Sequence, residues 1–175
     1  MVSWANLVTI GRILAIPVFI AILHYPSKYG SWIAAVVFCL IAATDAVDGW
    51  LARKNHAVTK FGTVLDPLAD KLLIASALIF LIGKGVPAWM AWVLIFRELG
   101  IVGLRLLVAR KVTIPASILG KFKTVFEMFG VIAVLLGFAY AWWILLGAVV
   151  FSLVSAFEYF WKYRRLLAHG ITRSK

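Results

Sequence analysis

Long apolar runs alternate with short polar connections along most of this chain. Six runs are each about 20 residues long, which is the length that an α-helix needs to cross the hydrocarbon core of a bilayer. Pro and Gly mark several of the connections, for example at residues 25–27, 83–85 and 114–115. The pattern predicts one all-α domain, residues 1–175, with six transmembrane helices. The predicted spans are 6–23, 31–50, 62–82, 87–108, 117–140 and 142–163.

The composition supports an integral membrane protein. Of the 175 residues, 64% are hydrophobic and only 14% are charged, and the mean hydropathy is +1.01. A soluble domain of this size could not bury so much apolar surface, so these values exclude a disordered chain and a typical water-soluble enzyme. The first run contains Arg12 and follows no basic segment, so we expect a span there and not a cleaved signal. The single Cys39 excludes an intrachain disulfide, and with the three His it makes no zinc site.

The net charge of +11 is distributed unevenly between the two predicted sides of the membrane. Thirteen of the 18 Lys and Arg residues fall in or beside the second loop, the fourth loop and the C-terminal tail, whereas only Lys28 and Lys84 fall on the other side. Cytoplasmic loops carry such an excess of basic residues. We therefore predict a multi-pass protein of the cell (inner) membrane with both termini cytoplasmic. The charge is expected to contact anionic lipid headgroups and not nucleic acid.

The acidic residues are few and clustered. Four of the seven fall within 26 positions, at the inner ends of the second and third spans: Asp45, Asp48, Asp66 and Asp70. Spacings of three and four place each pair on one helix face, and a short loop lets the two pairs converge. Carboxylates buried together need neutralisation, and oxygen ligands suit Mg²⁺ or Mn²⁺. The sequence therefore predicts a divalent-metal site, and the alternative is a set of structural salt bridges with Arg12, Arg53 and Lys71.

The spacing of these residues carries a resemblance. Residues 45–70 fit the pattern D-x2-D-G-x2-A-R-x8-G-x3-D-x3-D at all eight fixed positions. This pattern resembles the signature of the CDP-alcohol phosphatidyltransferase family, and the six predicted spans are similar to that family's helical bundle. The resemblance implies a membrane enzyme of phospholipid biosynthesis that uses CDP-diacylglycerol, releases CMP and depends on two divalent ions, Mg²⁺ or Mn²⁺. It also suggests a homodimer among membrane lipids. The charge distribution places the inner ends of the spans, and with them the predicted active site, on the cytoplasmic side.

The chemistry of such a reaction gives each motif residue a role. The four Asp are expected to bind the metal, which bridges diphosphate oxygens, and the resemblance implies that Asp70 is also the base for the acceptor hydroxyl. Gly49 and Gly62 would let the backbone approach the nucleotide, unless they serve helix packing. Arg53 would bind phosphate oxygens, unless it is an anchor at the cytoplasmic face of the membrane.

The first predicted span has a polar face. Asn6, Thr9 and Arg12 recur every three residues, and polar residues on a membrane helix should point inward. This face resembles the polar first helix of the family, so we assign it to the nucleotide and its phosphates. The alternative is polar contact between helices.

Basic residues in the fourth and fifth spans indicate where an acceptor would bind. Arg97 and Arg105 lie within one span, and Lys121 and Lys123 open the next. Arg97 lies about 13 residues, or roughly 20 Å, from the cytoplasmic end, where an unpaired charge is costly. These four residues predict an internal cationic pocket for a phosphorylated acceptor. The alternatives are an ion pair between Arg97 and an Asp or Glu, and ordinary loop charges at Lys121 and Lys123.

The segment 97–124 also resembles the branch of the family whose acceptor is sn-glycerol 3-phosphate. That resemblance implies transfer of the phosphatidyl group from CDP-diacylglycerol to this acceptor, which gives phosphatidylglycerol phosphate and CMP. Inositol phosphate, and then serine, remain alternative acceptors, and an archaeal ether lipid remains an alternative donor. Two other classes are a divalent-cation or proton-coupled transporter and a structural scaffold. Neither explains the complete motif, and no acidic path continues outward from the four Asp.

Overall fold

The computed structural model of the chain describes residues 4–25, 29–54, 62–108 and 118–171. Within these ranges, the side chains of residues 10–25, 29–44, 69, 71–103 and 119–161 are described. This part of the chain is all-helical, as predicted, and each helix falls on one of the predicted apolar runs. Its six helices are α1 (Trp4–His24), α2 (Gly30–Lys54), α3 (Gly62–Phe80), α4 (Ala88–Val108), α5 (Ile118–Leu135) and α6 (Ala141–Ile171).

The ends of the helices differ from the predicted spans where local chemistry stops or extends the helix. Helix α5 ends at Leu135 and not at residue 140, because Gly137 takes a φ of 68° that favours glycine. The Phe138 amide then donates to the Ala133 carbonyl at 2.8 Å, and the Gly137 amide donates to the Val134 carbonyl at 3.0 Å, which closes the last turn. Helix α6 continues past the predicted end at residue 163 to Ile171.

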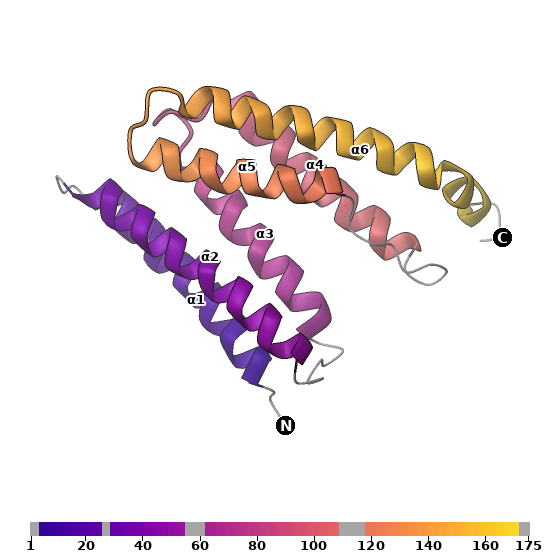
Figure 1. The fold of residues 1–175 in the computed structure, drawn as a ribbon, viewed down its shortest axis with the longest axis horizontal. Coiled ribbons are helices and arrows are strands. Elements are labelled where there is room, and N and C mark those ends of the chain that lie inside the picture. Colours follow the sequence, from indigo (N-terminus) through magenta and orange to yellow (C-terminus); the bar gives the residue numbers. More distant parts are fainter. Residues whose placement is uncertain (1–3, 26–28, 55–61, 109–117, 172–175) are drawn as a thin grey trace.

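The helices form two groups (Figure 1). Helix α1 packs against both α2 and α3, and α6 packs against both α4 and α5. We refer to α1–α3 as the N-terminal half and to α4–α6 as the C-terminal half. The closest packing is between α5 and α6, where a Cβ atom on Gly130 would lie only 2.5 Å from Leu145 Cδ2. The two halves meet through fewer contacts, made by α2 and α3 with α4 and α5.

Apolar side chains fill the interior of the bundle and also cover its outside. Phe19 and Phe38 are fully buried, with their ring centroids 5.9 Å apart, and Leu145 is buried between α5 and α6. Other large apolar side chains point outward, among them Trp92 and Phe96, which are 70% and 75% exposed. The buried set also contains polar and charged residues, namely Arg12, Lys123, Glu127, Ser152 and Ser155. Burial of polar and charged side chains together with exposure of large apolar side chains is the distribution expected of helices in lipid.

Helix α6 is the one helix in the described ranges that is long and apolar enough to count as a candidate membrane span. Its segment Ala141–Trp161 has 21 residues and a hydropathy of 1.8. Shorter apolar helical segments are Ile10–His24, Gly30–Thr44 and Lys71–Phe80. Charged residues interrupt α4 and α5, which lowers their hydropathy. The six-helix architecture is therefore confirmed for the described residues, and six crossings of a membrane remain a prediction.

Candidate active site

The four Asp of the motif lie on two helices, near the α2 and α3 ends that lie at the same end of the bundle (Figure 1). Asp45 and Asp48 belong to the last turns of α2, and Asp66 and Asp70 belong to the first turns of α3. The backbone is helical at all four positions, so spacings of three and four do place each pair on one helix face. Their side chains lie outside the described set. The convergence of the two pairs therefore stays a prediction.

The chemistry of this donor set fits a hard divalent cation. Four carboxylates offer only oxygen ligands, which Mg²⁺ and Mn²⁺ prefer, and the connection between α2 and α3 spans only residues 55–61. Among the side chains that the structure describes, no three or more His, Cys, Asp or Glu gather where a metal could bind. The four Asp are not part of that set, so they remain the candidate metal ligands of the chain.

The other residues predicted to contact the donor lie on α2 and α3 and on the neighbouring α1. Gly49 and Arg53 are in the last turns of α2, Gly62 is the first residue of α3, and Asn6 and Thr9 are in the first two turns of α1. The side chains of Arg53, Asn6 and Thr9 are outside the described set. Arg12, one turn further along α1, has a described side chain and is only 5% exposed. This burial agrees with a polar face of α1 that points into the bundle.

A cavity of about 370 Å³ lies where α3 meets the C-terminal half, and three of the predicted acceptor residues line it: Arg97, Lys121 and Lys123. Its volume falls in the range of about 300–1,000 Å³ that is usual for small-molecule pockets. The fourth predicted residue, Arg105, lies about two turns further along α4, with its side chain outside the described set. Four cations and one carboxylate line the cavity, because Lys71 and Glu98 also contribute to its wall.

Arg97 is tied to two helices at once. Its Nη1 lies 2.6 Å from Glu98 Oε1, its Nε donates to the Ser152 carbonyl at 3.1 Å, and its Nη2 donates to Ser155 Oγ. The sequence predicts that Arg97 either lines a pocket or forms an ion pair. In the structure it does both, because it lines the cavity and is paired with Glu98. The ion pair reduces the cost of holding a guanidinium inside the bundle, and the contacts to α6 fix its orientation.

Lys123 is the most deeply buried of the cations. Its side chain is 2% exposed, and its Nζ contacts Glu98 Oε1 and lies 2.9 Å from Glu127 Oε2. Glu127 is one helical turn away on α5 and is 1% exposed. Burial of an ammonium group without such partners would be prohibitive, so the two carboxylates explain how α5 carries a charge at this place.

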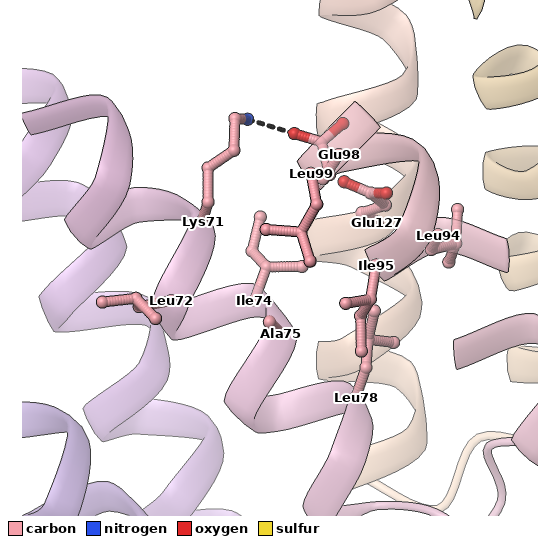
Figure 2. Close-up of a pocket in the computed structure, with 10 residues that line it drawn as sticks. All are labelled: Lys71, Leu72, Ile74, Ala75, Leu78, Leu94, Ile95, Glu98, Leu99 and Glu127. Atoms are coloured by element: carbon pink, nitrogen blue, oxygen red, sulfur yellow. Dashed lines mark ion pairs between the residues drawn. The ribbon is translucent and has the colours of Figure 1, made fainter. Parts of the chain in front are cut away.

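Glu98 holds the cluster together, and the sequence reasoning missed its role. One carboxylate oxygen contacts Arg97 and Lys123, and the other contacts Lys71. Figure 2 shows Lys71 on α3 reaching toward Glu98 on α4, with Glu127 directly beside them. A signal was available in part: Lys123 and Glu127 are four residues apart, a spacing that favours an ion pair on one helix. Nothing in the spacing of Lys71 and Glu98 along the chain indicates that they meet.

The arrangement suits the binding of a phosphate group. Cations outnumber carboxylates on the cavity wall, and a phosphate dianion would find Arg and Lys side chains around it. Thr124 also lines the cavity, and its hydroxyl donates its proton to the Gly120 carbonyl at 3.2 Å within the same region of α5. Lys71 directly follows Asp70 in α3, so this cavity lies next to the helical turn that carries one acidic pair.

Comparisons with known proteins agree with the family that the motif resembles. A family model described as CDP-alcohol phosphatidyltransferase matches residues 2–154. The CDP-diacylglycerol–glycerol-3-phosphate 3-phosphatidyltransferase of Bacillus subtilis (strain 168) is 40% identical over 184 residues, which cover 93% of this chain and 95% of that protein. A protein of the same name from Rickettsia bellii (strain RML369-C) is 41% identical over 134 residues, 75% of this chain and 74% of that protein. Another, from Pseudomonas fluorescens, is 43% identical over 103 residues, 57% of this chain and 53% of that protein.

Proposed function

The chain belongs to the CDP-alcohol phosphatidyltransferase family, and on that premise we propose that it transfers a phosphatidyl group from CDP-diacylglycerol to sn-glycerol 3-phosphate. The products are phosphatidylglycerol phosphate and CMP. The single observation that carries the acceptor assignment is the cationic cavity beside α3, because glycerol 3-phosphate brings a phosphate dianion that serine and free inositol lack. The names of the similar proteins agree with this acceptor.

The acceptor phosphate is proposed to bind among Arg97, Lys123 and Lys121, with Arg105 completing the site from α4. Arg97 can present its planar donors to two phosphate oxygens, and Lys121 lies at the exposed rim, where it can guide the anion inward. Glu98 and Glu127 form ion pairs with Arg97 and Lys123, whereas Lys121 is exposed. A bound phosphate would share these cations with the two carboxylates.

The donor diphosphate is proposed to bind at the ends of α2 and α3. Asp45, Asp48, Asp66 and Asp70 would hold divalent cations, Mg²⁺ or Mn²⁺, which when bound neutralise charge on the diphosphate oxygens. Arg53 would contact the phosphates directly, and Gly49 and Gly62 would leave room for the nucleotide. The polar face of α1, formed by Asn6, Thr9 and Arg12, would contact the cytidine and its phosphates. The burial of Arg12 supports this last assignment.

The proposed reaction is a substitution at the phosphorus that carries the diacylglycerol. The primary hydroxyl oxygen of glycerol 3-phosphate forms a bond to this phosphorus, and the bond from phosphorus to the bridging oxygen of the diphosphate breaks. CMP leaves with the electron pair of that bond. The hydroxyl proton passes to the carboxylate of Asp70, the residue that directly precedes Lys71 in α3.

Six crossings of the cell membrane, with both termini and the active site on the cytoplasmic side, complete the proposal. The uneven distribution of basic residues and the apolar exterior of the helices support it. A reporter fused after Lys175 should be active only on the cytoplasmic side, and activity on the opposite side would contradict the topology. We also propose a homodimer, by resemblance to the family, and a monomer mass in mixed micelles would exclude it.

The experiment that tests the function is an acceptor panel. Purified protein receives CDP-diacylglycerol with glycerol 3-phosphate, inositol phosphate, serine or inositol, and CMP release is measured. We expect release with glycerol 3-phosphate alone. Equal turnover of serine or free inositol would show that the cations do not select a phosphate. Turnover of inositol phosphate but not of glycerol 3-phosphate would keep the pocket and change the acceptor.

A further inference from the structure

The proposed donor and acceptor sites belong to different halves of the bundle. The motif Asp lie on α2 and α3, whereas the acceptor cations lie on α4 and α5. Each half is packed within itself, since α1 joins α2 and α3 and α6 joins α4 and α5. The relative position of the two substrates therefore depends on the contacts that α2 and α3 make with α4 and α5.

One ion pair crosses between the halves in the part of the chain whose side chains are described. Lys71 Nζ on α3 contacts Glu98 Oε2 on α4, with side chains 27% and 13% exposed (Figure 2). The other ion pairs of the cluster stay within the C-terminal half, because Arg97 and Glu98 share α4 while Lys123 and Glu127 share α5. We refer to the Lys71–Glu98 pair as the bridge.

Both ends of the bridge are attached to a substrate site. The second oxygen of Glu98 contacts Arg97 and Lys123, two cations that line the acceptor cavity. Lys71 is the residue that directly follows Asp70, the proposed base. A shift of the bridge would therefore change the separation between the acidic turn of α3 and the acceptor cations.

Apolar packing between α3 and α4 is incomplete beside the bridge. A groove of about 60 Å³ lies between α3 and α4 directly beside the bridge, and Figure 2 shows apolar side chains on its walls. Among these are Ile74 and Leu78 from α3 and Ile95 from α4. A void removes the van der Waals contacts that would otherwise hold two helices at a fixed distance. The ion pair consequently contributes more to the spacing of α3 and α4 here than it would in a filled interface.

We propose that the Lys71–Glu98 bridge sets the distance between the donor site and the acceptor site, so that Lys71 is a positioning residue of the transfer reaction. This inference rests on the proposed function. Attack requires the acceptor oxygen to lie about 3–3.5 Å from the phosphorus, and a misplacement of about 1 Å can cost roughly 100-fold in rate. Glycerol 3-phosphate is too short to compensate for a displaced helix. Loss of the bridge should lower kcat while each substrate still binds.

The test compares Lys71→Met, which keeps the length of the side chain and removes its charge, with Lys71→Arg, which restores the charge. Lys84→Met is the matched control, because Lys84 is exposed in the connection between α3 and α4, away from the cluster. For each protein, kcat and both KM values are measured by CMP release, and the binding of CDP and of glycerol 3-phosphate is measured separately. We expect Lys71→Met to lower kcat roughly 10- to 100-fold, with both KM values changed by less than about threefold. Lys71→Arg should recover most of the rate, and Lys84→Met should behave as wild type.

Several results would overturn the proposal. An unchanged kcat in Lys71→Met would show that the bridge does not position the substrates. A large rise in KM for glycerol 3-phosphate at constant kcat would make Lys71 a phosphate ligand, since it also lines the larger cavity. If Lys71→Met is not recovered folded, Lys71→Gln replaces it, and equal rates of Lys71→Gln and Lys71→Arg would reject the bridge. Absence of CMP release in the wild type would instead reject the proposed function, and this inference with it.

Discussion

The N-terminal and C-terminal halves treat charge in different ways. In the N-terminal half the proposed chemistry depends on carboxylates gathered at the ends of α2 and α3, and we expect bound cations to neutralise them. In the C-terminal half it depends on cations, and the chain supplies the counter-charges itself. Arg97 and Lys123 are paired with Glu98, and Lys123 is also paired with Glu127.

Because the charges of the two halves are neutralised in different ways, a mutation should affect activity in one half and stability in the other. A site that is neutralised by a ligand can lose the ligand and remain folded, although it loses its activity. A site that is neutralised by internal ion pairs cannot lose one partner without leaving a buried charge. Loss of the bound cations should therefore lower turnover at the N-terminal half. Loss of an ion-pair partner should lower the stability of the C-terminal half.

Removal of metal should give the largest effect and should act on the N-terminal half alone. EDTA is expected to abolish CMP release, and Mg²⁺ or Mn²⁺ should restore it, because the four Asp need a cation to bind the donor diphosphate. Asp48→Asn should reproduce the loss with metal present, on the order of 100- to 1,000-fold in kcat, since an amide is a poor ligand for a hard cation. The thermal midpoint of unfolding should change little. Full activity in chelator would remove the metal from the mechanism.

Loss of the buried cation in the C-terminal half should affect stability instead. Lys123→Met leaves Glu98 and Glu127 facing each other, each with one partner fewer. Breaking a buried pair in this way costs about 3–5 kcal/mol. The free energy of unfolding in mixed micelles measures this loss, with Lys84→Met as the control. An unchanged free energy would mean that the internal counter-charges are not needed, and the contrast between the halves would disappear.

Arg105 tests whether the acceptor site extends along α4. Removing one charge-assisted hydrogen bond to phosphate costs about 1.5–3 kcal/mol, so Arg105→Ala should lower kcat/KM for glycerol 3-phosphate roughly 10- to 150-fold. Arg105→Lys should recover only part of this loss, because lysine lacks the planar fork. Steady-state kinetics with each substrate varied in turn provides the measurement. A rise in KM for CDP-diacylglycerol as large as that for the acceptor would assign Arg105 to the donor site.

The two halves also differ in what the sequence could predict. The motif positions from Asp45 to Asp70 follow a local spacing, so the sequence predicts them as site residues, and their side chains lie outside the described set. The meeting of Lys71 with Glu98 depends on how α3 packs against α4 and α5, which no local pattern encodes. The role of Ser155 as a partner of Arg97 is a tertiary contact of the same kind.

Helix boundaries show the same limit on a smaller scale. Apolar runs located all six helices of the described chain, because helices that pack in lipid or in a protein core need long stretches of apolar residues. The end of α5 was predicted about five residues too late, because the apolar run continues past Gly137, whereas the backbone turns there. Gly137 inside the apolar run could have indicated the end of the helix, but a prediction based on hydropathy alone does not consider the backbone preference of glycine.

Lys121 should give the smallest effect, and its comparison with Lys123 sharpens the contrast between paired and unpaired charge. Both lysines line the same cavity on α5, but Lys121 is exposed while Lys123 is buried. Water and salt screen an exposed charge, so Lys121→Gln should raise KM for glycerol 3-phosphate only about two- to fivefold. The effect should shrink as ionic strength rises, whereas the stability loss of Lys123→Met should persist at high salt, because burial protects that pair from screening. KM measured at low and high salt for Lys121→Gln and wild type decides the matter. A tenfold or larger effect that does not depend on salt would place Lys121 inside the phosphate site, and the assignment of a rim role to it would be wrong.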